Sequence, residues 1–560
     1  MSFIFTFLAA MIVSMMLLPP LIVLGRRFQF VDQPSPRKVH ATPIPRIGGL
    51  AIAGALFAAL LTVDWSPLSA RYIAMLLAGT VVLVVGAIDD RHELGYRTKF
   101  IAQFIAAIIA VYGGGLVIEE ITLFSSVTIP AWIGAPLTVF CIVAIANAVA
   151  LSDGLDGLAG GIVFICCAAL AVLGYSVGNV TAALVAAGLA GAIFGFLRFN
   201  TYPAVIFMGD SGSQFLGVMS ALLAIDVTQS EPGRIAAALP LLLLAVPVLD
   251  TVQVMISRVM RGKSAFKPDK YHMHHRLLRI GLKHHEAVLA IYLVQCLFFL
   301  AAFFFRFESD LILVALLLFA GGAFVFAVIL LGNDNRGEVF KRRTKSYLSA
   351  TRRNALGNLV ASLVMCALLA YVVLLYGANS TLSVSPGDSL PGIQTQQLAL
   401  VLIAAVIASC LLMSKPKAGV FNQTVGYVVA AMLAFSASAT IDLSSSFVMP
   451  EFFLLALIGL ANVTWLLVSD RRESQMTTLD VLILFSALVV PNLPILADEI
   501  QSVATLILRL VCLFYAVEVT AAVFRSSWFF RALLLASLGL LAINRPFTDL
   551  SFSLSNFATL

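Results

Sequence analysis

The sequence has 560 residues, of which 61% are apolar and only 11% are Asp, Glu, Lys or Arg, and its mean hydropathy is +1.01. A soluble protein of this length keeps too much surface in water for such a composition, which excludes a cytosolic enzyme, a disordered chain and a secreted disulfide scaffold. The net charge of +6 is too small to indicate nucleic-acid binding. We therefore expect an all-α polytopic protein of the lipid bilayer.

The long apolar runs predict about 18 transmembrane helices. Eleven are expected at 3–24, 48–63, 72–88, 100–113, 131–150, 160–177, 181–197, 214–228, 236–257, 287–305 and 311–331. Seven more are expected at 356–376, 397–413, 419–437, 451–469, 479–497, 501–524 and 527–543. The basic stretch between the two groups predicts three parts: a membrane domain over 1–332, a cytoplasmic linker over 333–355, and a C-terminal membrane extension over 356–560.

The basic residues indicate how the chain is oriented. If the loop 25–47 is cytoplasmic, the loops on its side up to residue 355 carry 24 Lys and Arg, and the opposite loops carry three. Basic residues concentrate in cytoplasmic loops. We therefore expect the N-terminus outside and the polar clusters described next on the cytoplasmic side.

Two clusters of polar residues are acidic. In GAIDDRHELGYRTK, Asp89 and Asp90 are adjacent at the inner end of a predicted helix, where their charges repel unless a cation or proton is near. In NAVALSDGLDGLAGG, Asp153 and Asp156 are three residues apart and would share one face of a helix, while the glycines let the backbone approach a ligand. The alternative for Asp89 and Asp90 is a solvated helix end, and the alternative for Asp153 and Asp156 is a turn-forming loop.

A third cluster, RFNTYPAVIFMGDSGSQFLG, places Asp210 just before a predicted helix. With nearby backbone N–H groups its carboxylate could hold a metal and phosphate oxygens. The alternative is that Asp210 or Ser213 simply caps the helix.

The fourth cluster, KSAFKPDKYHMHHRLLRIGLKHH, is rich in histidine and basic residues. It lacks the i, i+4 histidine spacing of helical zinc sites and has no thiolate, so a cationic phosphate-binding loop is favoured over zinc. A solvated basic loop is the alternative. Together the four clusters predict a site where carboxylates bind Mg²⁺ and the basic loop neutralises a pyrophosphate, so that an aqueous nucleotide donor meets a lipid acceptor.

The four clusters in this order, with the opening segment VDQPSPRKVHATPIPRIGG, resemble the polyprenyl-phosphate N-acetylhexosamine-1-phosphate transferase family, glycosyltransferase family 4, over roughly residues 1–332. HMHH is similar to the HxHH of its N-acetylglucosamine branch. The resemblance implies transfer of a sugar 1-phosphate, GlcNAc above all, from a UDP-N-acetylhexosamine to undecaprenyl phosphate, with release of UMP. It also implies a location in the bacterial cytoplasmic (inner) membrane and a product that starts a surface polysaccharide such as an O-antigen or wall polymer.

The resemblance also implies roles for individual residues. The implied catalytic residues are Asp89, Asp90, Asp153, Asp156, His272, His274 and His275. The implied substrate-binding residues are Arg37, Lys38, His40, Arg46, Lys99, Asn147, Asn200 and Arg276. Asp210 and Asp153 are the implied ligands of Mg²⁺, or of Mn²⁺. The family usually has a second Asn where this chain has Ala150, so Asp153, Ser152 or water must complete the metal shell.

A membrane transporter or a scaffold for lipid-linked saccharides is the alternative function, with the extension as a transport or docking module. Transporters place polar groups near the middle of broken helices, whereas the clusters here lie at helix ends. A homodimer and partner glycosyltransferases are the expected protein partners. In the extension, Arg509 and Glu518 fall within one predicted helix and face opposite sides, so we expect no direct pairing between them.

Overall fold

The computed structural model describes residues 2–33, 42–61, 69–92, 94–230, 235–262 and 272–333, together with 500–524 and separate residues between 362 and 538. The chain divides into two compact units. The first is Met1–Thr344 with Thr477–Leu482, and the second is Lys345–Met476 with Ile483–Leu560. Residues 334–355 of the predicted linker, and most of the predicted helices of the extension, lie outside the described residues.

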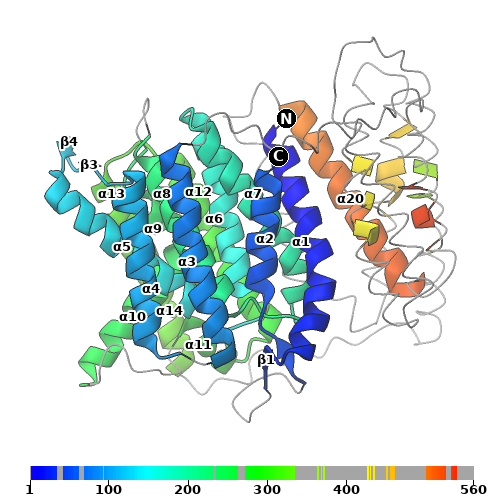
Figure 1. Cartoon of the computed structure of the whole chain (residues 1–560), viewed down its shortest axis with the longest axis horizontal. Coiled ribbons are helices and arrows are strands. Elements are labelled where there is room, and N and C mark those ends of the chain that lie inside the picture. The colour runs from blue at the N-terminus through cyan, green and yellow to red at the C-terminus, as the bar shows by residue number, and fades with distance from the viewer. Residues whose placement is uncertain are drawn as a thin grey trace, which may run out of the picture. The chain divides into compact units, whose positions relative to one another are not determined.

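The first unit is a bundle of helices with two short β-hairpins (Figure 1). Its helices up to Thr228 are α1 (Ser2–Arg27), α2 (Gly48–Leu60), α3 (Ala70–His92), α4 (Tyr96–Ile108) with the π-helical turn η1 (Ile109–Gly113), α5 (Ala131–Leu151), α6 (Leu158–Ser176), α7 (Val180–Asn200) and α8 (Gly209–Thr228). The later ones are α9 (Leu239–Leu243), α10 (Ala245–Met260), α11 (Met273–Ile280), α12 (His284–Phe304), α13 (Asp310–Leu316), η2 (Leu317–Gly321) and α14 (Gly322–Asn333). The hairpins pair β1 (Val31–Asp32) with β2 (Ile44–Pro45) and β3 (Glu120–Thr122) with β4 (Ser126–Thr128).

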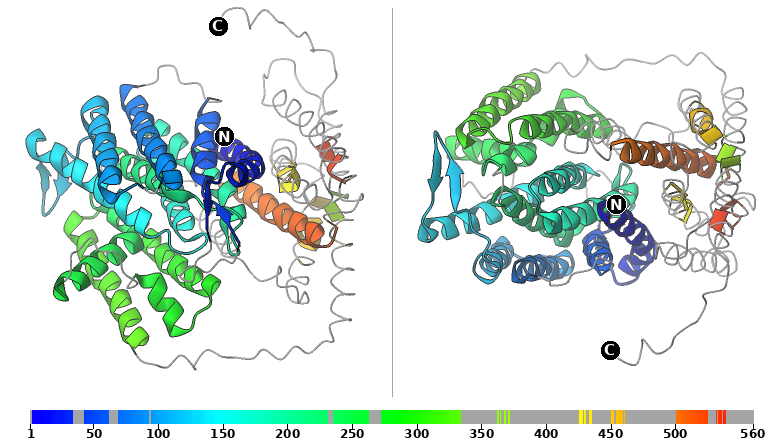
Figure 2. Two further views of the ribbon diagram at one scale, coloured as in Figure 1. Left: turned by 60° about the horizontal axis from the view of Figure 1, so that its bottom comes forward. Right: turned by 90° about the horizontal axis from the view of Figure 1, so that it is seen from above.

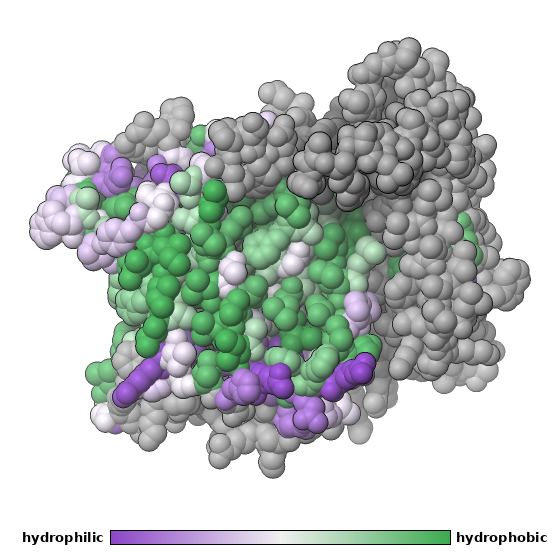
Figure 3. All heavy atoms as spheres, viewed as in Figure 1, coloured by the Kyte–Doolittle hydropathy of each residue, from purple (hydrophilic) through white to green (hydrophobic). Residues whose placement is uncertain are grey.

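Each of the eleven ranges predicted before residue 332 contains helix. Among the described residues, seven helices are long and apolar enough to cross a membrane: α1, α3, α5, α6, α7, α8 and α12. The surface of the first unit shows a broad apolar belt with hydrophilic residues above and below it (Figure 3). The mostly helical fold and the multi-pass membrane character are therefore confirmed, whereas the total of 18 helices stays a prediction.

The predicted helix 236–257 is divided at Leu244 into α9 and α10. Pro247 explains the break, because it has no N–H to donate and its ring clashes with the carbonyl four residues earlier. Gln295 of α12 satisfies the backbone groups that the break leaves: its Oε1 accepts from Val246 N at 3.2 Å, and its Nε2 donates to Leu243 O at 2.9 Å. The break is therefore accommodated inside the protein.

Helix α8 is the centre of the unit. The apolar stretch of α8 is completely buried inside the protein, and its mean hydropathy of 1.2 is the lowest of the seven candidate spans. Helix α8 therefore faces protein rather than lipid. Seen from above, α6 and α7 also lie in the interior, between the N-terminal helices and those after residue 240 (Figure 2, right). Glycines bring α2 and α3 against the first turn of α8, since a Cβ on Gly49 would lie 2.3 Å from Gly212 N and one on Gly86 2.5 Å from Ser211 Cα.

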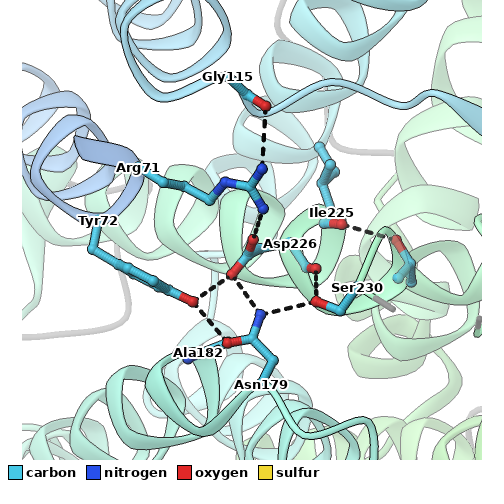
Figure 4. Close-up of polar contacts among 9 residues, drawn as sticks. Arg71, Tyr72, Gly115, Asn179, Ala182, Ile225, Asp226 and Ser230 are labelled. Carbon is cyan, nitrogen blue, oxygen red and sulfur yellow. Dashed lines mark hydrogen bonds and ion pairs between the residues drawn. The ribbon is translucent and has the colours of Figure 1, made fainter. Parts of the chain in front are cut away.

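A hydrogen-bonded network ties α3, α7 and α8 together at one end of the bundle (Figure 4). The fully buried Asp226 accepts from Arg71 Nη1 at 2.8 Å and from the Tyr72 hydroxyl at 2.8 Å. Asn179 Nδ2 donates to the same carboxylate at 3.0 Å. We call these four residues the Asp226 network. It lies at the ends of α3 and α8 opposite to those that carry Asp89 and Asp210.

The second unit contains α20 (Ile500–Phe524), which matches the predicted range 501–524. Its Arg509 pairs with Glu451 through two contacts of 2.7 Å, Nε to Oε1 and Nη2 to Oε2. The Tyr371 hydroxyl donates to Glu451 Oε1 at 2.9 Å, and all three side chains are buried. Arg509 is therefore neutralised by a carboxylate from a different part of the unit.

Candidate active site

A cavity of 740 Å³ lies at the end of the first unit where α3 ends and α8 begins. Figure 2, left, turns this end toward the viewer. Segments that are far apart in the sequence line the cavity with ionisable side chains: Asp32, Arg46, Asp90, Asp153, Asp156, Asp210, His275 and His284. All four polar clusters of the sequence therefore contribute to one concave surface.

Asp90 forms the cap of α8. Its Oδ1 accepts from Asp210 N at 2.7 Å, and its Oδ2 accepts from Ser211 N at 3.0 Å and from Ser211 Oγ at 2.7 Å. These backbone groups are the donors that a helix start leaves without intrahelical partners, and the partial positive charge there stabilises a carboxylate. The interpretation of Asp210 or Ser213 as the cap is wrong, because the cap comes from α3 and α8 begins at Gly209 rather than at 214.

Asp89 and Asp210 share one ammonium group. Lys99 Nζ lies 2.8 Å from Asp89 Oδ2 and 3.0 Å from Asp210 Oδ2. Asp89 is 4% exposed, and its Oδ1 has no hydrogen-bond partner among the described residues. Two carboxylates held by one cation retain a net negative charge, so this pair can accept a further cation.

The segment with Asp153 and Asp156 forms turns between α5 and α6, so the expected shared helical face is not formed. Asp156 is held by backbone contacts: its Oδ2 accepts from Ala204 N at 3.0 Å, and its own N–H donates to His284 Nε2 at 2.9 Å. Asp153 faces the cavity. Although Asp153 is exposed to the cavity, the protein packed around it and the negative charges of Asp210 and Asp156 raise the pKa of its carboxyl above the usual range.

The histidine cluster is not a solvated loop. Residues 273–280 form α11, and both His272 and His274 are buried. The His274 ring lies against Gly154, where a Cβ would be 2.3 Å from His274 Nε2. Burial and the neighbouring His275 and His272 lower the pKa of His274 to about 3. His274 is therefore neutral at pH 7, so the expected cationic cluster loses one of its charges.

The other predicted residues have different positions. Arg46 lines the cavity and forms an ion pair with Asp32. Asn200 also lines it, but its side chain fixes loops, accepting from Gly157 N at 3.0 Å and donating to Ile206 O at 2.8 Å. Arg276 lies in α11. Arg37, Lys38 and His40 lie outside the described residues.

Asn147 is not among the residues that line the cavity, whereas Ala150 is. Its Nδ2 donates to Gln103 Oε1 at 2.6 Å and to Val143 O at 2.9 Å, which joins α5 to α4. The expectation that Asn147 binds substrate is therefore not supported by its position. Asn147 instead satisfies polar groups between two helices.

Three residues of this region were not predicted. His284 and Tyr202 line the cavity with their rings stacked, the centroids 4.5 Å apart. Asp250 of α10 binds the first histidine of the cluster, with its Oδ2 2.8 Å from His272 Nδ1. The sequence carried a signal for Asp250, because a single acidic residue within an apolar run indicates a specific partner.

The acidic residues fit a magnesium ion. Among the described residues, no three His, Cys, Asp or Glu are grouped as a ready-made metal cage. Mg²⁺ does not need one, because it commonly binds one or two carboxylates and completes its shell with water and substrate phosphates. The partnerless Oδ1 of Asp89 and the excess of carboxylates over cations at Asp210 suit such an ion.

Comparison with known proteins agrees with this geometry. The model of glycosyl transferase family 4 matches residues 72–228. A Bacillus subtilis protein named as a probable undecaprenyl-phosphate N-acetylglucosaminyl 1-phosphate transferase is 33% identical, over 62% of this chain and 97% of its own length. The decaprenyl-phosphate N-acetylglucosaminephosphotransferase of Mycobacterium tuberculosis (strain H37Rv) is 35% identical, over 58% of this chain and 89% of its own.

A more distant relative is the undecaprenyl-phosphate alpha-N-acetylglucosaminyl 1-phosphate transferase of Escherichia coli K12, which is 29% identical over 49% of this chain and 76% of its own length. This chain therefore extends well beyond the part that these relatives share. Because nearly the whole of the Bacillus protein is matched, the chain belongs to glycosyl transferase family 4, the polyprenyl-phosphate sugar-1-phosphate transferase family that its motifs resemble.

Proposed function

We propose that this protein transfers N-acetylglucosamine 1-phosphate from UDP-N-acetylglucosamine to undecaprenyl phosphate and releases UMP. The observation that carries the proposal is the cavity at which all four polar clusters meet, in a chain of this family. The names of the relatives support the sugar and the polyprenyl phosphate acceptor. The lipid-linked product would start a surface polysaccharide, with partner glycosyltransferases acting next.

The proposed place of the reaction is the cytoplasmic face of the bacterial inner membrane. The cavity lies at the end of the bundle that carries the first loop, on the side to which the basic residues of the sequence are assigned. There a nucleotide sugar from the cytoplasm and the phosphate of a membrane-embedded lipid can reach the same carboxylates. A cavity at a helix end suits this meeting better than a transport path through the middle of the bilayer.

The chemistry follows from the charge of the acceptor. The second pKa of a phosphate monoester is about 6, so the lipid phosphate is mostly dianionic at pH 7 and is already a nucleophile. Its oxygen attacks the β-phosphorus of the donor, the bond from that phosphorus to the bridging oxygen breaks, and UMP leaves with that oxygen. No general base is required.

A double displacement through an aspartyl phosphate is the rival mechanism. The structure gives it little support, because both oxygens of Asp90 accept hydrogen bonds from the start of α8 and Asp89 is buried against Lys99. Arg46 and His275 line the cavity where the donor phosphates would lie. We therefore favour direct attack, with these side chains positioning the phosphates.

Asp210 and Asp153 would hold Mg²⁺, or Mn²⁺, which would supply positive charge to neutralise the pyrophosphate. The proposal is tested by incubating purified protein with undecaprenyl phosphate, Mg²⁺ and a panel of UDP-sugars, while UMP and the lipid product are measured. We expect UMP and a GlcNAc-pyrophosphate lipid with UDP-N-acetylglucosamine, and loss of both with EDTA. Absence of UMP with every UDP-N-acetylhexosamine would contradict the proposal.

A further inference from the structure

Asp250 is a buried acidic residue that the proposed chemistry does not use. It lies in α10 and is 4% exposed. Its Oδ2 is 2.8 Å from His272 Nδ1, and its Oδ1 accepts from Met273 N at 2.7 Å. Each of its two oxygens is therefore engaged by the residues at which α11 begins.

These contacts fix both a backbone and a side chain. The first N–H groups of a helix have no partner within the helix, and the carboxylate satisfies the one of Met273. The same carboxylate holds the His272 ring in one orientation, because its Nδ1 must carry a proton to donate. In the neutral ring, Nε2 is then the acceptor. Without the negative charge of Asp250, the His272 ring would no longer be held in the tautomer that carries its proton on Nδ1.

The position of the His272 ring affects the neighbouring histidines and, through them, the cavity. Its ring lies parallel to that of His274, with the planes at 10° and the centroids 5.8 Å apart. The His274 ring lies against Gly154, and His275 lines the cavity. The start of α11 thus sets where all three rings of the histidine cluster lie relative to the Asp153 turn.

We propose that Asp250 is a positioning residue, which acts on phosphoryl transfer through His272 and the start of α11. This inference rests on the proposed function, because turnover is its main measure. A carboxylate that orients a metal-binding imidazole is commonly worth about 10- to 100-fold in metal affinity or activity, and we take the same size for the imidazole of His272. We expect a loss of about this size in kcat when the charge is removed.

The test is a double-mutant cycle of Asp250→Asn and His272→Ala. Asn keeps the size of Asp and an acceptor for Met273 N, but its amide N–H₂ faces His272 Nδ1 and favours the opposite tautomer. We expect Asp250→Asn to lower kcat about 10- to 100-fold with a smaller change in KM for the UDP-sugar. In the His272→Ala background the same substitution should have no further effect on kcat. The inference would be overturned if the loss in kcat of the double variant equalled the product of the two single-variant losses. An unchanged kcat in Asp250→Asn would also overturn it.

A matched control is available in Asp310, which is 6% exposed and accepts from Thr122 N at 2.6 Å and Ala238 N at 2.7 Å. Asp310→Asn should leave kcat per folded molecule unchanged, with folded protein measured by size exclusion. If the wild-type protein releases no UMP, the proposed function fails and the inference is judged by ¹⁵N-histidine spectra. The His272 tautomer should then change in Asp250→Asn and not in Asp310→Asn, and an unchanged tautomer would overturn it.

Discussion

Helices α3 and α8 meet around acidic residues at both ends of their pairing, and the two ends are built differently. At one end, Asp226 is fully buried and receives three side-chain donors, including the cation of Arg71. At the other end, Asp89 and Asp210 share the single cation of Lys99, and Asp89 Oδ1 has no partner among the described residues. The same pair of helices therefore holds one saturated carboxylate and two that are short of positive charge.

This difference separates structural acids from functional ones. A buried charge that has all its partners is costly to disturb, because removing one partner leaves another polar group buried without a donor or counter-charge. Carboxylates left with too few cations destabilise the empty protein and are available to a ligand that brings positive charge. By this criterion we propose that the end with Asp210 binds the substrates, and that the Asp226 network serves to hold the helices together.

The substitution expected to have the largest effect on turnover is Asp210→Ala. It removes a carboxylate from the cation-poor end, so we expect UMP release to fall by about 100-fold or more. The melting temperature should stay the same or rise, because Asp89 then has Lys99 to itself. Steady-state UMP release and thermal unfolding measure the two effects. Retention of a tenth of wild-type turnover would contradict the assigned role of Asp210.

An intermediate effect is expected for Gly154→Ala. Its Cβ would lie 2.3 Å from His274 Nε2, so the ring has to move away from the Asp153 turn. We expect turnover to fall by roughly 10-fold and the free energy of unfolding to fall by about 1–3 kcal/mol, as for other overpacked sites. Gly95→Ala is the control, since a Cβ there meets nothing within 4 Å. Equal turnover in the two variants would show that the position of His274 does not matter.

The smallest effect on turnover is expected for Asp226→Asn, which acts on stability instead. The change removes the charge that pairs with Arg71, whose side chain is 40% exposed and can turn toward water. We expect a loss of about 1.5–3 kcal/mol in the free energy of unfolding. UMP release per folded molecule should change less than about twofold, because the site is at the other end of the helices. A fall in turnover as large as that of Gly154→Ala would remove the distinction between the two ends.

In the first unit, the sequence predicted the positions of the described helices and the gathering of the four clusters well, because apolar runs and dense polar motifs are local signals. It did not predict how the acids are used. Asp90 caps a helix that begins 119 residues later, and no local pattern could show this. The family resemblance likewise assigned Asn147 to substrate binding, whereas its contact with Gln103 depends on how α4 packs against α5.

Asp250 shows a different limit of sequence reasoning. It stands alone in the apolar run LLLLAVPVLDTV, and its partner follows 22 residues later, beyond the end of α10. A lone acid in such a run must find a partner, but the sequence does not say which of several basic residues it will be. The answer depends on how the chain returns to α10 after the helix ends.

The pairing of Arg509 with Glu451 has a consequence for how the chain is made. The two residues are 58 positions apart, so Glu451 leaves the ribosome first. At about 5–20 residues per second, Arg509 follows roughly 3–12 seconds later. During that interval Glu451 has no partner, and an acid at the start of a predicted membrane segment carries a penalty below the value of about 2.5–3.5 kcal/mol that applies at a helix centre. We therefore expect the segment that carries Glu451 to be less stably inserted in the membrane before α20 is made, and to be stabilised there once Arg509 pairs with it.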